Sequence, residues 1–192
     1  MNIVIFGPPG AGKGTQSNII VKKFNLYQLS TGELLRKEIK TNTALGLKIS
    51  SIINSGNLVS DDVVGNLIKE YVSNKIYKNR IIFDGYPRNL IQAKNLDNLL
   101  EKFDQKIDLV LKLSVNLETI KKRILERKIL EKRDDDSEDI AVKRYKMYED
   151  NIKPVINFYE QSNLLRVVNG EASINEISNE ISALIEGIKG WL

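Results

Sequence analysis

The feature that most constrains this chain is a glycine-rich segment between an apolar run and a helical pattern. Gly7–Thr15 reads GPPGAGKGT and directly follows the apolar run Ile3–Phe6. Glycines let several backbone N–H groups point at one anion, and the helix dipole and the charge of Lys13 add to the attraction. The segment therefore predicts a nucleotide phosphate site, because an ordinary βα turn does not need the G-x-x-x-x-G-K spacing. One departure is Gly14, which stands where the general pattern has Ser or Thr, so that the hydroxyl comes one residue later at Thr15.

Length and composition exclude several kinds of chemistry. A chain of 192 residues is long enough for one domain with a full core. It has no Cys and no His, which excludes disulfides, thiolate or histidine metal sites and histidine acid–base catalysis. No apolar run is long enough to span a membrane, and the N-terminus lacks the features of a signal peptide. We therefore expect a cytoplasmic protein that does not bind membranes.

The basic residues favour phosphate binding over nucleic-acid binding. The formal net charge is +4, but Lys and Arg are scattered among acidic residues, with no basic tail or stripe. Most basic residues are Lys, so the few Arg mark places where a planar, bidentate donor is needed. Six arginines lie in or beside the segments discussed below: Arg36, Arg88, Arg123, Arg127, Arg133 and Arg144.

Apolar runs alternate with helical patterns along the whole chain. The expected strands are Asn2–Phe6, Tyr27–Leu29, Arg80–Phe83, Leu109–Leu113 and Leu164–Val168. The expected helices are Lys13–Phe24, Thr31–Lys40, Ala44–Asn54, Asp61–Tyr77, Leu90–Phe103, Leu117–Lys128, Glu138–Tyr159 and Ile174–Ile188. This alternation predicts an α/β fold, a five-stranded parallel sheet with helices on both faces.

Two segments fit the sheet pattern poorly and predict additions to it. Thr31–Val59 holds two extra helical segments between two strands, so we expect an inserted lobe at about residues 30–59. Lys128–Ser137 is short and highly charged, which is compatible with a solvated loop but favours a small lid that carries Arg133 over bound phosphates.

Pro154 should kink or divide its helix. The apolar stripe of the last helix, which begins at Ile174, should face the core.

The segment Ile81–Arg88 is an apolar strand followed by a carboxylate and a rigid bend. Asp84, unless it only caps a helix, is placed to orient Mg²⁺ or its waters beside the phosphate loop. The bend delivers Arg88 to the carboxyl ends of the strands, where open α/β sheets bind ligands. Arg123 and Arg127 share one helix face and would repel each other unless an anion or acidic group lies between them.

Taken together, the residues favour phosphoryl transfer. One Lys and up to six Arg are available to polyphosphate, and no side chain is obviously placed as a nucleophile or strong base. Phosphoryl transfer needs mainly alignment and charge stabilisation. Six arginines exceed what one triphosphate needs, so we expect a second substrate that also carries phosphate.

With these motifs the chain resembles adenylate kinase in its short-lid form. The resemblance extends over essentially the whole length, and the Gly14–Thr15 variant of the phosphate loop is typical of nucleoside monophosphate kinases. The matching segments, in family order, are GPPGAGKGTQ at Gly7–Gln16, STGELLR at Ser30–Arg36, SGNLVSDDVV at Ser55–Val64, FDGYPRNLIQA at Phe83–Ala93, Arg123 with Arg127, RDDD at Arg133–Asp136, and KRY at Lys143–Tyr145.

The resemblance implies the reversible reaction of ATP with AMP to give two ADP, with Mg²⁺. The implied ATP-binding residues are Gly10, Ala11, Gly12, Lys13, Gly14, Thr15, Arg127 and Ala172, the last through its backbone. The implied AMP-binding residues are Thr31, Arg36, Asn57, Leu58, Val59, Gly85, Tyr86, Pro87, Arg88, Gln92, Arg133 and Arg144. The implied catalytic residues are Lys13, Arg88, Arg123, Arg127, Arg133 and Arg144. Asp84 is the expected Mg²⁺-associated carboxylate and Thr15 a further candidate, whereas a lid this short without Cys implies no zinc.

Two other functions remain open at this point. A UMP/CMP kinase shares most of this framework, but two residues favour AMP. They are Thr31 and Gln92, and the carboxamide of Gln92 offers both a donor and an acceptor to the edge of an adenine. A regulatory nucleotide-binding protein or a switch-type ATPase would have only one nucleotide site. We also expect a monomer, because no apolar stripe is left after the core is assigned.

Overall fold

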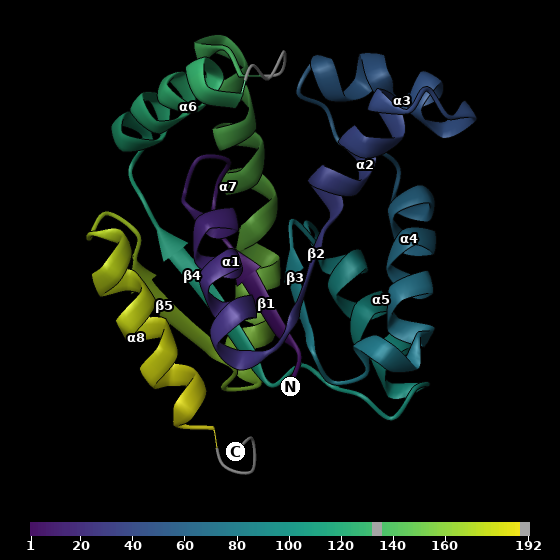
Figure 1. Ribbon diagram of the computed structural model, residues 1–192, viewed down its shortest axis with the longest axis vertical. Helices are drawn as coiled ribbons and strands as arrows, with labels where there is room; N and C mark the ends of the chain where they lie inside the picture. The colour runs from purple at the N-terminus through teal and green to yellow at the C-terminus, as the bar shows by residue number, and fades with distance from the viewer. Residues whose placement is uncertain (132–135, 189–192) are drawn as a thin grey trace.

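A parallel sheet forms the centre of the computed structural model, which describes residues 1–131 and 136–188. Its five strands lie in the order β2-β3-β1-β4-β5 and all pair in parallel (Figure 1). They are β1 at Ile3–Phe6, β2 at Tyr27–Ser30, β3 at Ile81–Asp84, β4 at Leu109–Ser114 and β5 at Leu165–Asn169. The predicted α/β fold with a five-stranded parallel sheet is confirmed.

Eight α-helices surround this sheet. They are α1 at Lys13–Phe24, α2 at Thr31–Lys40, α3 at Ala44–Asn54, α4 at Asp61–Ser73, α5 at Leu90–Glu101, α6 at Leu117–Glu131, α7 at Glu138–Gln161 and α8 at Ile174–Glu186, all within the described part of the chain. A 3₁₀ turn, η1, covers Lys75–Tyr77. Within the residues that the structure describes, no helix has the length and apolarity needed to cross a bilayer.

Several predicted helix ends differ from the structure by two or three residues, and α6 continues to Glu131, inside the segment predicted as a lid. The largest difference is at the end of α4. The helix expected to reach Tyr77 ends at Ser73, where the Asn74 side chain accepts a hydrogen bond from the Ile76 amide at 3.0 Å and redirects the backbone. Of the two outcomes predicted for Pro154, a kink or a division of its helix, division does not occur, because α7 is continuous through this residue. Pro154 is exposed, so water can replace the missing backbone bond.

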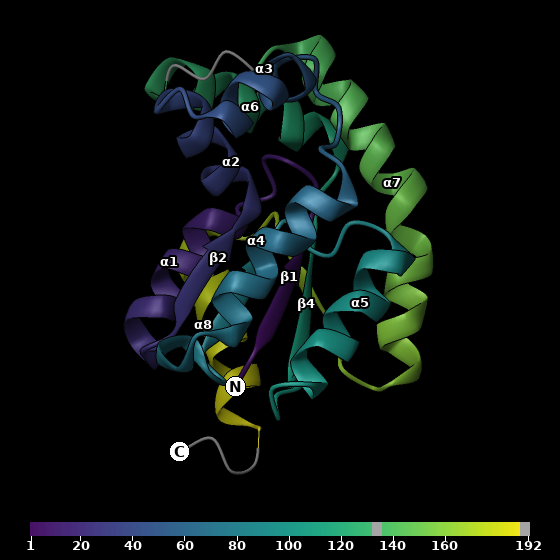
Figure 2. The same ribbon diagram turned by 90° about the vertical axis from the view of Figure 1, so that its right-hand side faces the viewer.

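Each face of the sheet has its own core layer, and both faces are buried. In β1, Val4 and Phe6 join the layer beneath α4, α5 and α7, whereas Ile3 and Ile5 join the layer beneath α1 and α8. Figure 2 shows these two helix layers on opposite faces. Burial on both sides explains why the central strands are uninterrupted apolar runs. One stripe residue was assigned wrongly: Ile174, the first residue of α8, is 56% exposed.

Helices α2 and α3 pack tightly against each other between β2 and α4. A Cβ built at Gly46 of α3 would come within 2.1 Å of the Glu38 carbonyl oxygen of α2, so only glycine permits this approach. In Figure 1 this pair and helix α6 stand on opposite sides beyond the carboxyl ends of the strands, and Figure 2 shows that both lie above the same edge of the sheet. The fold therefore leaves the carboxyl edge of the sheet open between two helical flanks.

Candidate active site

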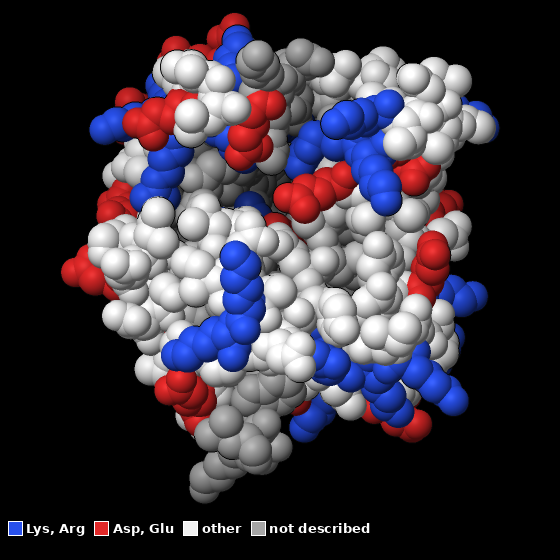
Figure 3. Space-filling view, viewed as in Figure 1, with Lys and Arg blue, Asp and Glu red and all other residues white. Residues whose placement is uncertain are grey.

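A cavity of about 830 Å³ lies at the carboxyl edge of the sheet, between the two flanks. Figure 3 shows the hollow on this face, with basic and acidic side chains around its mouth. Its walls come from the loop after β1, the start of α2, residues 56–59, the end of β3, and helices α6 and α7. Segments from most of the chain therefore converge on one site.

The glycine-rich loop after β1 forms one half of the floor of this cavity, and the end of β3 with the bend after it forms the other half. Gly10 and Gly12 have φ values of 86° and 92°, in the left-handed region that favours glycine. Gly12 is also the residue before α1, so the N-terminus of that helix opens into the cavity. A Cβ at Gly10 would meet Ile124 at 3.0 Å, which shows that the loop packs closely against α6. The predicted phosphate-binding residues 10–15 all line the cavity.

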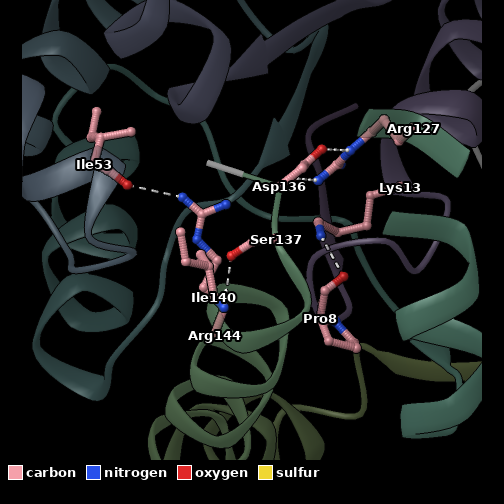
Figure 4. Close-up of polar contacts among 8 residues, drawn as sticks. All are labelled: Pro8, Lys13, Ile53, Arg127, Asp136, Ser137, Ile140 and Arg144. Atoms are coloured by element: carbon pink, nitrogen blue, oxygen red, sulfur yellow. Dashed lines mark hydrogen bonds and ion pairs between the residues drawn. The ribbon is translucent and has the colours of Figure 1, made fainter. Parts of the chain in front are cut away.

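Lys13 lies across this loop. Its Nζ donates a hydrogen bond to the carbonyl oxygen of Gly7 at 2.7 Å. It also donates to the carbonyl oxygen of Pro8 at 3.1 Å, the contact drawn in Figure 4. Burial lowers the pKa of Lys13 from 10.5 to about 8, and the nearby carboxylate of Asp84 offsets only part of this effect. The loop therefore holds a cation whose partners are neutral, so that an arriving phosphate would supply the opposite charge.

Asp84 ends β3 beside the loop, in register with Ile5 of β1. It is only 8% exposed, and its Oδ2 accepts a hydrogen bond from Gln28 Nε2 at 2.9 Å. Among the described residues, no three Asp, Glu, His or Cys side chains group closely enough to hold a metal ion. Mg²⁺ typically needs only one or two carboxylates when it binds with nucleotide phosphates and water. The oxygens of Asp84 and of Thr15, which is exposed in the cavity wall, fit an ion of that kind.

Arg88 projects from the bend that follows β3. Its Nε donates to the carbonyl oxygen of Gly85 at 2.7 Å, and the Thr31 hydroxyl donates to the same oxygen at 3.0 Å. The pKa of Arg88 lies below its usual value because the surrounding protein desolvates the guanidinium and because Arg144 and Arg36 add positive charge, although Asp84 acts in the opposite direction. The structure thus brings together three of the predicted arginines on the side away from the phosphate loop.

Helix α6 brings two further arginines, Arg123 and Arg127, to the cavity wall near the phosphate loop, whereas Arg144 comes from α7. Arg127 and Asp136 form a two-pronged ion pair, with Nε–Oδ2 at 2.7 Å and Nη2–Oδ1 at 2.6 Å. Arg123 Nη1 lies 3.5 Å from the carbonyl oxygen of Ala11 in the loop. Arg144 Nη2 reaches the carbonyl oxygen of Ile53 in α3 at 3.2 Å (Figure 4). Arg133 lies outside the described residues.

The other predicted site residues divide into two groups. Asn57, Leu58, Val59, Gly85, Arg36 and Ala172 line the cavity. Thr31, Tyr86, Pro87 and Gln92 are buried behind its wall. Gln92, only 3% exposed, donates from Nε2 to Asp61 Oδ1 at 2.6 Å and accepts at Oε1 from the Arg88 amide at 2.7 Å. Its carboxamide therefore already has one donor and one acceptor contact within the protein.

Sequence reasoning missed several residues that hold the site together. Gln28 supports Asp84, Asp61 holds Gln92, and Lys143 donates to the Ser55 carbonyl oxygen at 2.8 Å. Asp61 and Lys143 both lie inside the quoted family segments, which was a signal that could have singled them out. Gln28 carries no local signal, because only the pairing of β2 with β3 places it beside Asp84.

Comparison with known proteins gives one consistent result. The family profile described as adenylate kinase matches residues 5–164. An adenylate kinase of Pelagibacter ubique is 41% identical, with 97% of this chain and all of that protein covered. An adenylate kinase of Leptospira biflexa is 40% identical over 93% of this chain and 96% of that protein. One from Thermosipho africanus is 34% identical over 96% of this chain and 99% of that protein.

Proposed function

This chain belongs to the adenylate kinase family of phosphotransferases, and we propose that it transfers the terminal phosphoryl group of ATP to AMP, giving two ADP. The observation that supports this most directly is the pair of cationic groups in one cavity. The phosphate loop with Lys13 lies at one side, and Arg36, Arg88 and Arg144 lie at the other. The reported relatives are all adenylate kinases, and none of them favours a UMP/CMP kinase.

ATP occupies the loop side in this proposal. The backbone amides of residues 10–15 and the Lys13 ammonium bind its phosphates, and the backbone at Ala172 contacts its adenine. Arg123 and Arg127 face the same phosphates from α6. Adenylate kinases use Mg-ATP, and here Asp84, through water, and Thr15 would hold the Mg²⁺ that neutralises phosphate charge.

AMP occupies the opposite side. Arg36 and Arg88 bind its phosphate, and Gly85–Arg88 with residues 57–59 form the wall around the nucleotide. Thr31 and Gln92 contact the base. Both side chains are buried behind the cavity wall, so the base must insert against that wall to reach them. Arg144 and Arg133 bridge the two nucleotides at the transferring group, Arg133 from outside the described residues.

The chemistry is a direct in-line transfer. A phosphate oxygen of AMP attacks the terminal phosphorus of ATP while the bond from that phosphorus to the bridging oxygen of the β-phosphate breaks, so that ADP is the leaving group. The arginines stabilise the charge that spreads over the transferring oxygens. We propose that residues 30–59 close over AMP and that a short lid at residues 128–137, of which 132–135 lie outside the described residues, closes over ATP. Closure excludes water, which would otherwise attack the same phosphorus. We further propose a cytoplasmic monomer without zinc.

A parallel assay tests the proposal. ADP formation from Mg-ATP is measured with AMP, UMP, CMP or no acceptor. ADP formed rapidly with AMP alone is the expected result, whereas a preference for UMP or CMP would overturn the base assignment. Formation without any acceptor would indicate a hydrolase.

A second measurement separates the kinase from a protein that only binds one nucleotide. A bisubstrate analogue that joins two adenosines through a polyphosphate should bind one chain far more tightly than ATP does. Equal affinities would indicate a single nucleotide site and would contradict the two-sided cavity proposed above.

A further inference from the structure

The carboxylate of Asp61 joins the start of α4 to the segment that carries Arg88 and Gln92. Its Oδ1 accepts from Gln92 Nε2 at 2.6 Å, and its Oδ2 accepts from Asn89 Nδ2 at 3.1 Å. Asn89 in turn caps α5, because its Oδ1 accepts from the Gln92 amide at 2.8 Å. One carboxylate thus holds both the side chain of Gln92 and the residue that caps its helix.

This network determines which end of the Gln92 carboxamide points where. The Arg88 N–H requires an oxygen opposite it, and the Asp61 carboxylate requires an N–H. Turning the amide over would place two donors together at Arg88 and two acceptors together at Asp61. A carboxamide has two N–H groups and two acceptor lone pairs, so one of each remains for another partner.

A fixed amide distinguishes the two kinds of purine. At the edge formed by N1 and the 6-substituent, adenine offers an acceptor and a donor. A 6-oxopurine such as hypoxanthine offers a donor and an acceptor in the reverse order. An amide held in one orientation matches only one of these patterns, whereas an amide free to turn over matches both.

We propose that Asp61 is a positioning residue that sets the preference for AMP over 6-oxopurine monophosphates by fixing the Gln92 carboxamide. This inference rests on the proposed role of Gln92 at the AMP base. The charge of Asp61 also acts on this region of the site. Burial is the main reason that the pKa of Tyr86 is raised to about 12, and the negative charge of Asp61 is the second. Asp61 also follows residues 57–59 of the proposed AMP wall almost directly.

The test compares kcat/KM for AMP with kcat/KM for inosine monophosphate. Asp61→Leu removes one of the two groups that fix the amide, and the AMP:IMP ratio should fall about tenfold, as expected for losing a hydrogen bond to a charged group. Asp61→Asn, which can face either end of the amide, should lower the ratio about threefold. Asp62→Leu is the matched control, because the exposed Asp62 carries the same charge in the same first turn of α4, and its ratio should not change.

The ratio separates positioning from a loss of stability, since partial unfolding lowers activity toward both acceptors equally. An unchanged ratio in Asp61→Asn, which preserves side-chain volume, overturns the inference even if Asp61→Leu does not fold. An equal fall in Asp62→Leu also overturns it. Gln92→Ala identifies where a failure lies. A ratio that responds to Gln92→Ala but not to Asp61 variants rejects the inference alone, whereas no response to Gln92→Ala rejects the proposed base contact as well.

Discussion

The cations on the floor of the cavity contact backbone close to them in the sequence, whereas most cations of the flanks reach distant segments. Lys13 bonds to Gly7 and Pro8 in its own loop, and Arg88 bonds to Gly85 in its own bend. On the flanks, Lys143 and Arg144 of α7 reach Ser55 and Ile53, about ninety residues earlier.

This difference separates what is preformed from what depends on the arrangement of the flanks. The floor contacts follow from a strand, a tight loop and a helix that fold together, so they persist wherever the flanks lie. The flank contacts link segments that are far apart in the sequence, and the proposed closure over the substrates would move these segments relative to each other. We therefore expect substitutions on the floor to affect turnover and local charge, and the loss of a contact between flank segments to affect stability or the affinity for one substrate.

The largest effect is expected for Arg88→Ala on the floor. Arg88 is proposed to stabilise the transferring phosphoryl group, and its loss should lower kcat roughly 10³-fold, comparable to losing an arginine finger. Steady-state kinetics with Mg-ATP and AMP measure this. Arg80→Ala is the control, because Arg80 directly precedes β3 at the end of the strand away from the cavity and bonds to the Asn25 carbonyl oxygen. A loss below about tenfold for Arg88→Ala, with normal folding, would remove Arg88 from the proposed catalytic set.

The same expectation of a substantial loss, about 10³-fold, applies to Arg133→Ala, since Arg133 is proposed to bridge both nucleotides. The same assay measures it. Unchanged turnover would exclude Arg133 from the proposed arginine set.

The next effect concerns the charge of Lys13. Its pKa is about 8 in the folded protein and 10.5 in the unfolded chain, so the folded state binds fewer protons between these values. Burial of the charged amine therefore costs stability below pH 8, and that cost disappears as the pH rises toward 10.5. Relative to Lys13→Met, the free energy of unfolding of the unmodified protein should rise by up to roughly 3 kcal/mol across this range, at about 1.36 kcal/mol per pKa unit.

Equilibrium unfolding in urea at pH 7.5, 9 and 10.5 measures this difference. Lys22→Met, at an exposed position of the same helix, serves as the control and should show no comparable trend. A pH-independent difference between Lys13→Met and the unmodified protein would mean that the loop does not depress the pKa of Lys13.

A smaller effect is expected where a flank arginine pairs with a buried carboxylate. The Asp136 side chain is 1% exposed and the Arg127 side chain 23%. Arg127→Met leaves a buried charge without its partner and should cost about 2 kcal/mol of unfolding free energy, less than for a fully buried pair. Arg123→Met, four residues away, removes only a long contact and should cost under about 1 kcal/mol. Urea titrations of both variants decide this, and equal losses would contradict the distinction.

The floor of the site was also easier to predict from sequence than its walls. The phosphate loop and the β3 strand ending in Asp84 carry local signals, in glycine spacing and in apolar runs, and the structure places them as expected. The ties between Gln28 and Asp84 and between Asp61 and Gln92 depend on which segments pack together, which no local pattern specifies. Gln92 was predicted as a contact of the base from the family resemblance, but only the structure shows that Asp61 and the Arg88 amide hold its carboxamide.

The smallest effect tests the flank contact between α7 and the end of α3. The Lys143 ammonium bonds to the Ser55 carbonyl oxygen at the C-terminus of α3, where a cation is favourable, and Ser55 lies just before the proposed AMP wall at residues 57–59. Lys143→Met should raise KM for AMP about threefold, as expected for one exposed hydrogen bond, while KM for ATP stays unchanged. Lys146→Met, on an exposed position of the same helix, is the matched control for charge. Initial rates with each substrate varied in turn measure both constants. A rise in both KM values, or an equal rise in the control variant, would mean that this contact does not act on the AMP side alone. The contrast between a preformed floor and substrate-specific flanks would then fail at this contact.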